Sequence, residues 1–144
     1  MSYTVDVNIL LYASNVSSAE HSKASAFMAE RGASAELWCM AWVTLMGYMR
    51  MATHPAIFTK PLSHDAAAAN VEALLALPQV RVVDEGPGFW ARYRDVAREV
   101  PVRGNLVPDA HLVAVLRQHG VRTIYTRDRD YRKWSGLAVV DPIG

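Results

Sequence analysis

The sequence predicts one α/β domain built on a parallel five-stranded sheet. Its 144 residues are about the length of a single domain. Hydrophobic residues make up 51% of the chain and charged residues 20%, a balance that suits a packed core. Short apolar stretches alternate with longer helical patterns along the chain. This alternation favours a parallel sheet covered by helices on both faces, with residues 1–144 in one domain.

The first half of the chain opens with an apolar strand that runs into a helix at 5–12, with Asp6 at the junction. Ser17 and Glu20 form a capping-box pattern, and the helix that they predict ends at Gly32. The elements expected next are a short strand at 36–40, a helix at 44–52 that is apolar nearly all round, and an Ala-rich helix that Ser63 caps and Pro78 stops.

The second half shows the same alternation. Pro108 in the first turn and Gly120 just past the end delimit a helix at 108–119. The other expected elements are strands at Val80–Val83, 122–126 and 137–140, a helix at Phe89–Glu99, and a turn with a short helix at 127–134.

Composition restricts the classes of protein to which the chain can belong. The formal net charge of +1 does not by itself indicate nucleic-acid binding, although 12 of the 15 cationic residues are Arg, which suits phosphate recognition. The single Cys39 excludes a cysteine metal site and indicates a reducing compartment. The first residues lack a signal-peptide pattern, and the uncharged run at 37–49 is too short to span a bilayer. We therefore expect a cytoplasmic protein.

Carboxylates stand at three junctions between predicted elements. Asp6 ends the first strand, Asp128 follows the fourth, and Asp109 lies in the first turn of the helix at 108–119. Helix capping, turn formation or compensation of the helix dipole explains each of them taken alone. Ligands of parallel sheets bind beyond the carboxyl ends of the strands. If the first and fourth strands are neighbours, all three carboxylates can converge there.

Three carboxylates in one cleft repel each other, and a bound proton or cation relieves that repulsion. Ligand sets made of oxygen alone select a hard cation, Mg²⁺ or Mn²⁺. A divalent ion held in this way is common in phosphodiester hydrolysis, because it activates a water molecule and neutralises charge on the phosphate. The histidines indicate no zinc site, since they are scattered among element ends and the surface: His21, His54, His64, His111 and His119.

These motifs resemble those of PIN-domain ribonucleases, and specifically those of VapC-type toxins from type II bacterial toxin–antitoxin systems. The matching stretches are VDVNIL at 5–10, PDAHL at 108–112 and YTRDRDY at 125–131. The stretches WVTL at 42–45 and RMATHP at 50–55 resemble one branch of these toxins. Their order and spacing are fairly specific, and the resemblance covers essentially the whole chain.

The resemblance implies a PIN-like three-layer α/β/α fold and an Mg²⁺-dependent endoribonuclease, with Mn²⁺ as a substitute ion. Such a toxin cuts tRNA or rRNA, blocks translation, and is held inactive by a cognate antitoxin. Asp6, Asp109 and Asp128 match the acidic positions that bind the metal and catalyse. Asn8 and Thr126 match the polar neighbours that support them, and Asp130 is a candidate substitute or helper.

One position departs from the family pattern. The family usually places a Glu in the middle of the helix at 44–52, where this chain has Gly47. Because affinity for a hard cation follows the number and charge of its ligands, we expect one moderately held ion on Asp6 and Asp109, helped by Asp128 and often reached through water. A second ion would enter with the scissile phosphate.

Two alternative functions remain open. Gly47 also fits a catalytically weak PIN domain that binds RNA or a protein. A phosphatase of the haloacid-dehalogenase type also has an Asp after its first strand, but it needs a second Asp two residues later, where this chain has Asn8, and a catalytic Lys near a motif. Metal-dependent cleavage of a structured RNA separates the ribonuclease from the binding module.

Partner surfaces are expected in the Met-rich middle of the chain. The helix at 44–52 is apolar nearly all round, which is typical of a helix buried in the core or in an interface. We expect a homodimer to which residues 37–51 contribute apolar contacts. We also expect an antitoxin whose basic side chain reaches the acidic cleft.

Overall fold

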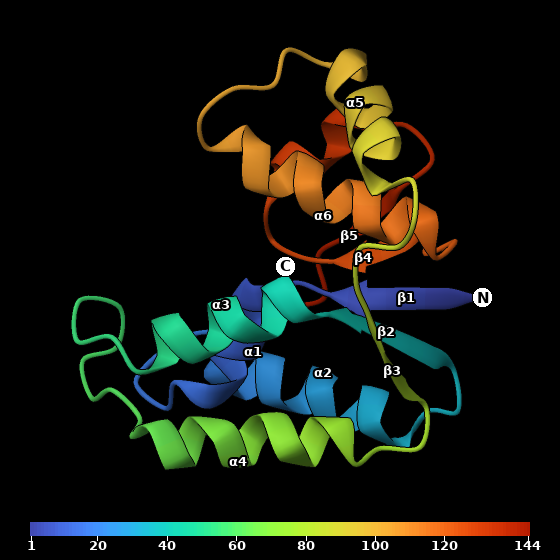
Figure 1. Cartoon of the computed structure of the whole chain (residues 1–144). Helices are drawn as coiled ribbons and strands as arrows, with labels where there is room; N and C mark the ends of the chain where they lie inside the picture. Colours follow the sequence, from blue (N-terminus) through green and yellow to red (C-terminus); the bar gives the residue numbers. More distant parts are fainter.

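The computed structural model describes residues 1–144 as one parallel sheet between two layers of helices (Figure 1). The strands are β1 (Ser2–Val5), β2 (Leu37–Ala41), β3 (Val80–Val83), β4 (Thr123–Tyr125) and β5 (Ala138–Val140). The helices are α1 (Val7–Ser14), α2 (His21–Ala33), α3 (Trp42–Ala52), α4 (His64–Leu75), α5 (Phe89–Glu99), α6 (Leu106–Gln118) and the 3₁₀ helix η1 (Arg129–Lys133).

The strand order is β3-β2-β1-β4-β5, and every neighbouring pair is parallel. The first strand in the sequence, β1, therefore lies at the centre of the sheet. Its neighbour β4 pairs with it at Thr4↔Ile124 and Val5↔Tyr125. The prediction of a five-stranded parallel sheet in a three-layer α/β/α fold is confirmed, and so is the condition that the first and fourth strands are adjacent.

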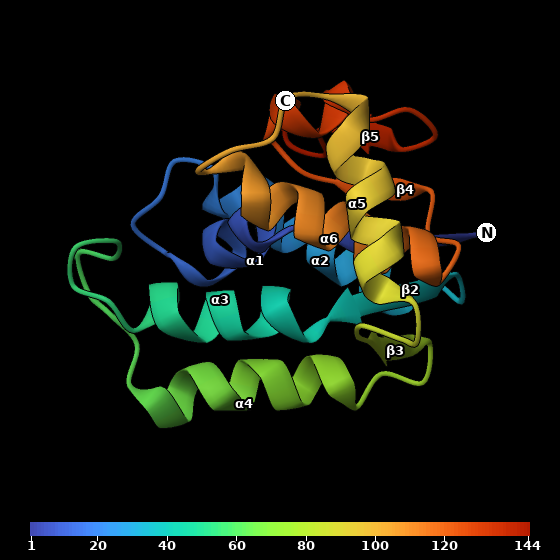
Figure 2. The same ribbon diagram turned by 45° about the horizontal axis from the view of Figure 1, so that its top comes forward.

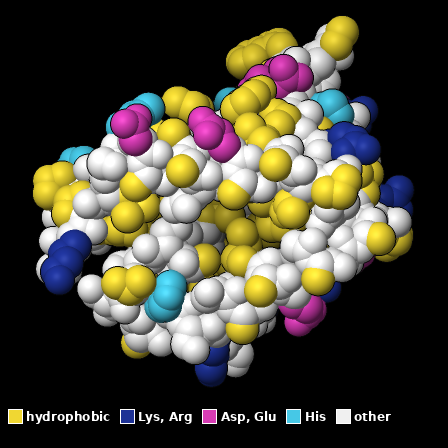
Figure 3. All heavy atoms as spheres, turned by 90° about the horizontal axis from the view of Figure 1, so that it is seen from below, with side chains coloured by type: hydrophobic (Ala, Val, Ile, Leu, Met, Phe, Trp, Pro, Cys, Tyr) yellow, Lys and Arg dark blue, Asp and Glu magenta, His cyan; other side chains and the backbone are white.

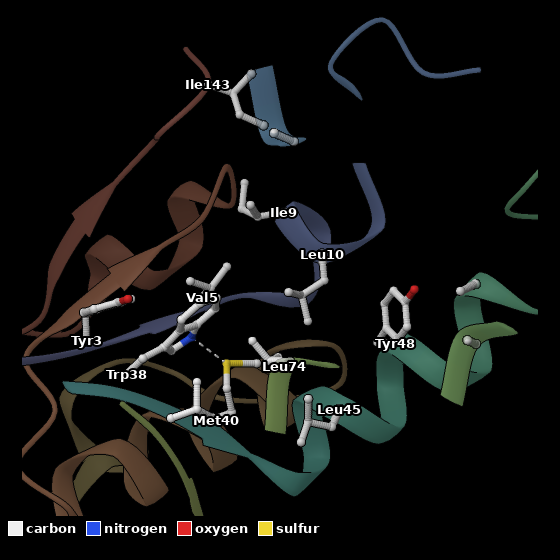
Figure 4. Packing of buried hydrophobic residues seen from close by; sticks show 14 of the residues in the cluster. Tyr3, Val5, Ile9, Leu10, Trp38, Met40, Leu45, Tyr48, Leu74 and Ile143 are labelled. Atoms are coloured by element: carbon white, nitrogen blue, oxygen red, sulfur yellow. Dashed lines mark hydrogen bonds between the residues drawn. The ribbon is translucent and has the colours of Figure 1, made fainter. Parts of the chain in front are cut away.

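Alternation of side chains along the strands divides the interior into two cores. Trp38 and Met40 of β2 pack with the layer of α1 to α4, where the Trp38 Nε1 donates to the Met40 sulfur at 3.0 Å (Figure 4). Cys39 and Ala41, on the other face of the same strand, pack with α5 and α6. Both faces of the sheet are thus buried, as a parallel sheet requires.

Helices α3 and α4 lie side by side at one side of the molecule (Figure 2). The Ser63 side chain caps α4 by accepting from the Ala66 amide at 3.1 Å, as predicted. Between the two helices, the buried Phe58 packs into the core that contains Trp38 and Met40, and the Leu62 amide donates to the Ala52 carbonyl at 2.9 Å. The loop at 53–63 is therefore tied to the end of α3.

The predicted capping box at Ser17 and Glu20 is wrong. Helix α2 begins at His21, and Glu20, the residue before it, makes no side-chain capping bond. Ser18 organises this turn instead, because its hydroxyl accepts from the Glu20 amide at 3.1 Å. A Ser followed by a Glu three positions later also fits a loop, and the sequence pattern does not separate the two.

Two other helices begin two residues earlier than predicted. Helix α3 starts at Trp42, directly after β2, and α6 starts at Leu106, so that Pro108 is its third residue. A proline is tolerated there because the amide groups of the first turn have no partner within the helix. Neither shift moves Gly47 or Asp109 out of its helix.

Candidate active site

The three predicted acids stand where elements meet at one edge of the sheet. Asp6 caps the start of α1 directly after β1, and Asp128 occupies the same position before η1, after β4. Asp109 lies in the first turn of α6. Because β1 and β4 are adjacent and parallel, their carboxyl ends bring Asp6 and Asp128 to the same edge.

A cleft of about 500 Å³ opens at this edge. Asp6, Asp109 and Tyr131 line its acidic side, and α3 lines the other with residues on one helical face: Val43, Met46, Gly47 and Arg50. Carboxylate oxygens of Asp109, Asp128 and Asp130 lie within 4.8 Å of one another. Asp6 is outside that trio but shares the cleft with Asp109. The prediction that Asp6, Asp109 and Asp128 hold one ion together stays a prediction.

Asp6 is held rigidly by hydrogen bonds. One carboxylate oxygen accepts from the Val7 amide at 2.8 Å, and the other accepts from the Thr126 hydroxyl at 2.7 Å. Asp6 and Thr126 are both buried. A carboxylate fixed by donors on both oxygens keeps free lone pairs in a defined direction, which is the geometry that an ion-binding ligand needs.

Thr126 links the ends of β1 and β4. While its hydroxyl donates to Asp6, it accepts from the Asn8 side-chain amide at 3.0 Å and from the Asp128 amide at 2.9 Å. The Asn8 oxygen also accepts from the Arg127 amide at 3.4 Å. Asn8 and Thr126 therefore lie beside Asp6 and Asp128, and their supporting role in a metal site stays a prediction.

Asp128 and Asp130 form the outer part of the acidic group. Asp128 caps η1 by accepting from the Asp130 amide at 2.9 Å. Asp130 is exposed, and its carboxylate accepts from Lys133 at 2.9 Å. Asp128 thus combines the capping role with a place in the acidic group, and Asp130 is the more loosely held member.

Burial and electrostatic repulsion make Asp6 and Asp109 hard to ionise. Burial raises the pKa of Asp109 to about 6; the charges of Asp128 and Asp6 add to the rise, and the Tyr131 hydroxyl opposes it. Burial also raises the pKa of Asp6, against the Thr126 and Val7 hydrogen bonds. The pKa of the Tyr131 hydroxyl is raised by its burial and by the surrounding carboxylates. A bound cation would relieve this strain.

The donor set suits a hard divalent cation. The acidic side of the cleft offers carboxylate and hydroxyl oxygens, with no sulfur or imidazole ligand. His111 lies elsewhere, hydrogen-bonded to Glu85 and against the Phe89 ring. Oxygen ligands of this kind favour Mg²⁺ or Mn²⁺.

Gly47 leaves the α3 side of the cleft without a ligand. A Cβ atom added there would have Met51 Cε and Val7 Cγ2 as its nearest neighbours, both at 3.9 Å. These are ordinary van der Waals distances, so a Cβ atom at this position fits without displacing a neighbour.

Sequence reasoning missed two residues of the cleft. Tyr131 is buried in the core that α5 and α6 form with the sheet, and it lines the cleft with Asp109. Arg50 lines it from α3. The signal for Arg50 was its place one helical turn after Gly47, on the same face. The signal for Tyr131 was its spacing of three from Asp128, which a 3₁₀ helix places on one side.

Comparison with known proteins agrees with this architecture. The PIN domain family model matches residues 3–137. The chain is 44% identical over 142 residues to ribonuclease VapC48 of Mycobacterium tuberculosis, covering 99% of this chain and 98% of the relative. It is 34% identical over 137 residues to ribonuclease VapC37 of the same species, covering 92% of both.

Solved structures share the fold. The crystal structure of Mycobacterium tuberculosis VapC20, described as a sarcin–ricin loop cleaving toxin, superposes with a TM-score of 0.67 at 20% identity, covering 90% of this chain and 92% of that one. A toxin–antitoxin complex from Klebsiella pneumoniae superposes with a TM-score of 0.60 at 19% identity, covering 97% of both. Because the family model and the VapC ribonucleases match nearly the whole chain, the chain belongs to the PIN domain family, as a VapC-type ribonuclease toxin of a type II toxin–antitoxin system.

Proposed function

We propose that the protein is an Mg²⁺-dependent endoribonuclease that hydrolyses phosphodiester bonds of tRNA or rRNA and thereby inhibits translation. The observation that carries the proposal is the acidic cleft at the carboxyl ends of β1 and β4, where burial and mutual repulsion raise the pKa of Asp109 to about 6. We place this activity in the cytoplasm, because both classes of RNA work there.

Asp6, Asp109 and Asp128 are the proposed ligands, with Asp130 as a helper. The bound Mg²⁺ would supply an activated water and neutralise negative charge on the phosphate. Thr126 and Asn8 hold Asp6 and the turn at Asp128 in register through the hydrogen bonds of 2.7, 3.0 and 2.9 Å. Val43 and Met46 of α3 give the opposite side of the cleft an apolar lining.

The test is cleavage of total tRNA and of rRNA by the purified protein, in Mg²⁺ and in EDTA. We expect discrete products with Mg²⁺ or Mn²⁺ and none in EDTA. Asp109→Asn should lose activity, and Asp84→Asn, an exposed acid outside the cleft, should keep it. Cleavage that persists in EDTA would contradict the metal-dependent reaction.

Gly47 favours a second candidate function. In this alternative the protein is a PIN domain that binds RNA or a protein and cleaves RNA only weakly. The cleft has one carboxylate fewer than the family pattern implies, which lowers its affinity for a cation. RNA binding without cleavage at Mg²⁺ concentrations up to about 10 mM, which fill even a weak metal site, would favour this alternative.

The proposed antitoxin contact is an apolar hollow on the helical face away from α5 and α6. A pocket of about 200 Å³ lies there among α1, α2, α3 and α4, lined by Leu10, Met28, Leu45 and Leu74. Figure 3 shows this face with hydrophobic side chains in the floor of a hollow and few charges around it. We propose that an apolar segment of the antitoxin occupies it, while a basic side chain of the antitoxin reaches Asp109.

Co-expression with the neighbouring gene's product tests this contact. Met28→Glu should weaken complex formation, because it puts a charge into the apolar hollow, and should leave RNA cleavage intact. Phe89→Glu, on α5 beyond the sheet, serves as the control and should leave the complex intact. Equal weakening by both variants would contradict the assignment of this hollow.

A further inference from the structure

Arg50 is the cation that faces the acidic cleft. It lies in the last turn of α3 and lines the cleft with Asp6 and Asp109, and no other Lys or Arg lines it. Its guanidinium comes from the helical wall, whereas the carboxylates come from the sheet edge and α6. Both signs of charge therefore face one space.

Arg50 has no partner within the protein. Arg31, Arg98, Arg117 and Arg127 each pair with an acid, but Arg50 takes part in no ion pair. Its side chain also makes no hydrogen bond. A cation in the last turn of a helix favours the helix dipole, but that role needs no place in a cleft.

Gly47 leaves room for the Arg50 side chain. Residues three apart on a helix share a face, and helical side chains lean toward the N-terminal end. Arg50 therefore leans toward the turn of Gly47, which itself has no side chain. The nearest atoms to a Cβ at Gly47 would be Met51 Cε and Val7 Cγ2, both at 3.9 Å, and Val7 follows Asp6 in the chain. Arg50, Gly47 and Asp6 all line this one cleft.

We infer that Arg50 binds a phosphate of the RNA in the cleft, a contact that rests on the proposed ribonuclease function. A guanidinium presents a planar fork of donors that matches two phosphate oxygens. The carboxylates repel the RNA backbone, so a cation on the facing wall is needed to bring a phosphate close to them. Arg50 supplies this attraction from one helical turn after Gly47. Gly47 is the position at which the family pattern has a carboxylate.

Binding is measured apart from cleavage. Fluorescence anisotropy with a labelled tRNA, in an Asp109→Asn background that leaves the RNA uncut, gives the affinity at several salt concentrations. Arg50→Gln should weaken binding about tenfold and reduce the slope of log affinity against log salt by about one. Arg50→Lys should keep the slope, because it keeps the charge. Arg94→Gln, an exposed arginine of α5 outside the cleft, is the matched control and should change neither quantity beyond the general effect of one surface charge.

Cleavage kinetics give a second readout in the otherwise unmodified protein. Arg50→Gln should raise KM with a smaller change in kcat, and the midpoint of thermal unfolding should stay within the range of Arg94→Gln. If Arg50→Gln binds RNA as Arg94→Gln does, with the same salt slope, the inference is overturned even when the unmodified protein cleaves RNA. If the unmodified protein binds but does not cleave, the proposed function fails while the contact of Arg50 is still tested.

Discussion

Asp109 bears the repulsion of the cleft at the scale of a single residue. Burial and the neighbouring charges raise its pKa to about 6, from an ordinary value of 3.8. The folded chain therefore holds this proton more tightly than the unfolded chain does, between those two pH values. Deprotonation as the pH rises through 6 lowers the stability of the metal-free protein, and this part of the stability is fully present only below about pH 4.

Asp109→Asn should accordingly make the metal-free protein more stable at pH 7.5 and leave it nearly unchanged at pH 3.5. We expect a gain of about 1 kcal/mol at pH 7.5, after allowance for solvent screening of a half-buried group. Urea unfolding in EDTA at both pH values measures it, with Asp84→Asn as the control. An equal gain at both pH values would show that repulsion in the cleft is not its source.

Mg²⁺ should stabilise the unmodified protein and fail to stabilise Asp109→Asn. An ion that binds only the folded state adds RT ln(1 + [Mg²⁺]/Kd), about 2.7 kcal/mol at one hundred times Kd. Thermal unfolding in Mg²⁺, in Ca²⁺ and in EDTA gives the shift without any RNA present. A Mg²⁺-induced rise in Tm that survives Asp109→Asn would remove Asp109 from the ligand set.

At the scale of the element, α3 decides what the cleft contains. Gly47, in the interior of this helix, weakens it by about 0.5–1 kcal/mol relative to Ala, because glycine loses more backbone freedom on folding. A Cβ at this position would make only ordinary contacts, with Val7 and Met51 at 3.9 Å. The helix thus retains a locally unfavourable residue at the wall of the candidate site.

Gly47→Glu should tighten Mn²⁺ binding to the free protein, because it adds one carboxylate to the cleft. Gly47→Gln is the matched control, since it has the same size and a similar helix propensity without the charge. Without metal, Gly47→Gln should gain up to about 1 kcal/mol in stability. Gly47→Glu should gain less, because its charge adds to the repulsion in the cleft. Only the Glu variant should gain affinity by calorimetric titration. Two tight sites in the unmodified protein, or no gain with Glu, would show that Gly47 is not the vacant ligand position.

Element types were predictable from sequence because their periodicity and end signals are local. Phe89–Glu99 and Val80–Val83 match their predicted bounds, since Gly88 and Pro78 mark their starts. The start of α2 was not predictable, because the Ser18 hydroxyl takes the contact that the capping box assigns to a helix.

The acidic positions of the site were predictable for the same reason: each follows a strand or opens a helix. The sequence indicated Thr126 only through its match to a family position. Its hydrogen bonds to Asp6 and Asn8 join residues 120 and 118 positions apart, which no local pattern predicts. The spacing of Tyr131 from Asp128 and of Arg50 from Gly47 indicates a shared face, but which space that face lines depends on how η1 and α3 pack around the sheet edge.

At the scale of the whole molecule, apolar side chains remain on the surface around α3. Trp42, Val43 and Met46 of α3 are between 41% and 60% exposed. Leu37, 40% exposed, lies at the other end of β2, beside Ser2. A cluster of this kind on one side of a small protein is typical of an interface. No helix of the structure is long and apolar enough to cross a membrane. We expect the cluster to be covered by a second copy of the chain.

Trp42→Glu should therefore convert a dimer into a monomer. Static light scattering at tens of micromolar, a concentration at which a micromolar interface is filled, gives the mass directly. Trp90→Glu is the control, because Trp90 is 66% exposed but lies on α5, outside residues 37–51. An unmodified protein that is monomeric at this concentration, or a Trp42→Glu variant that stays dimeric, would count against this interface.

The central place of β1 has a consequence for the time at which the toxin becomes active. Asp6 leaves the ribosome early, but Thr126, which holds it, is 120 residues later. At about 5–20 residues per second, synthesis of that interval takes roughly 6 to 24 s, and the pairing of β1 with β4 must then close a very long loop. The cleft is therefore assembled only after β4 and Thr126 have been made, so the N-terminal part of the chain that carries Asp6 holds an incomplete site until then.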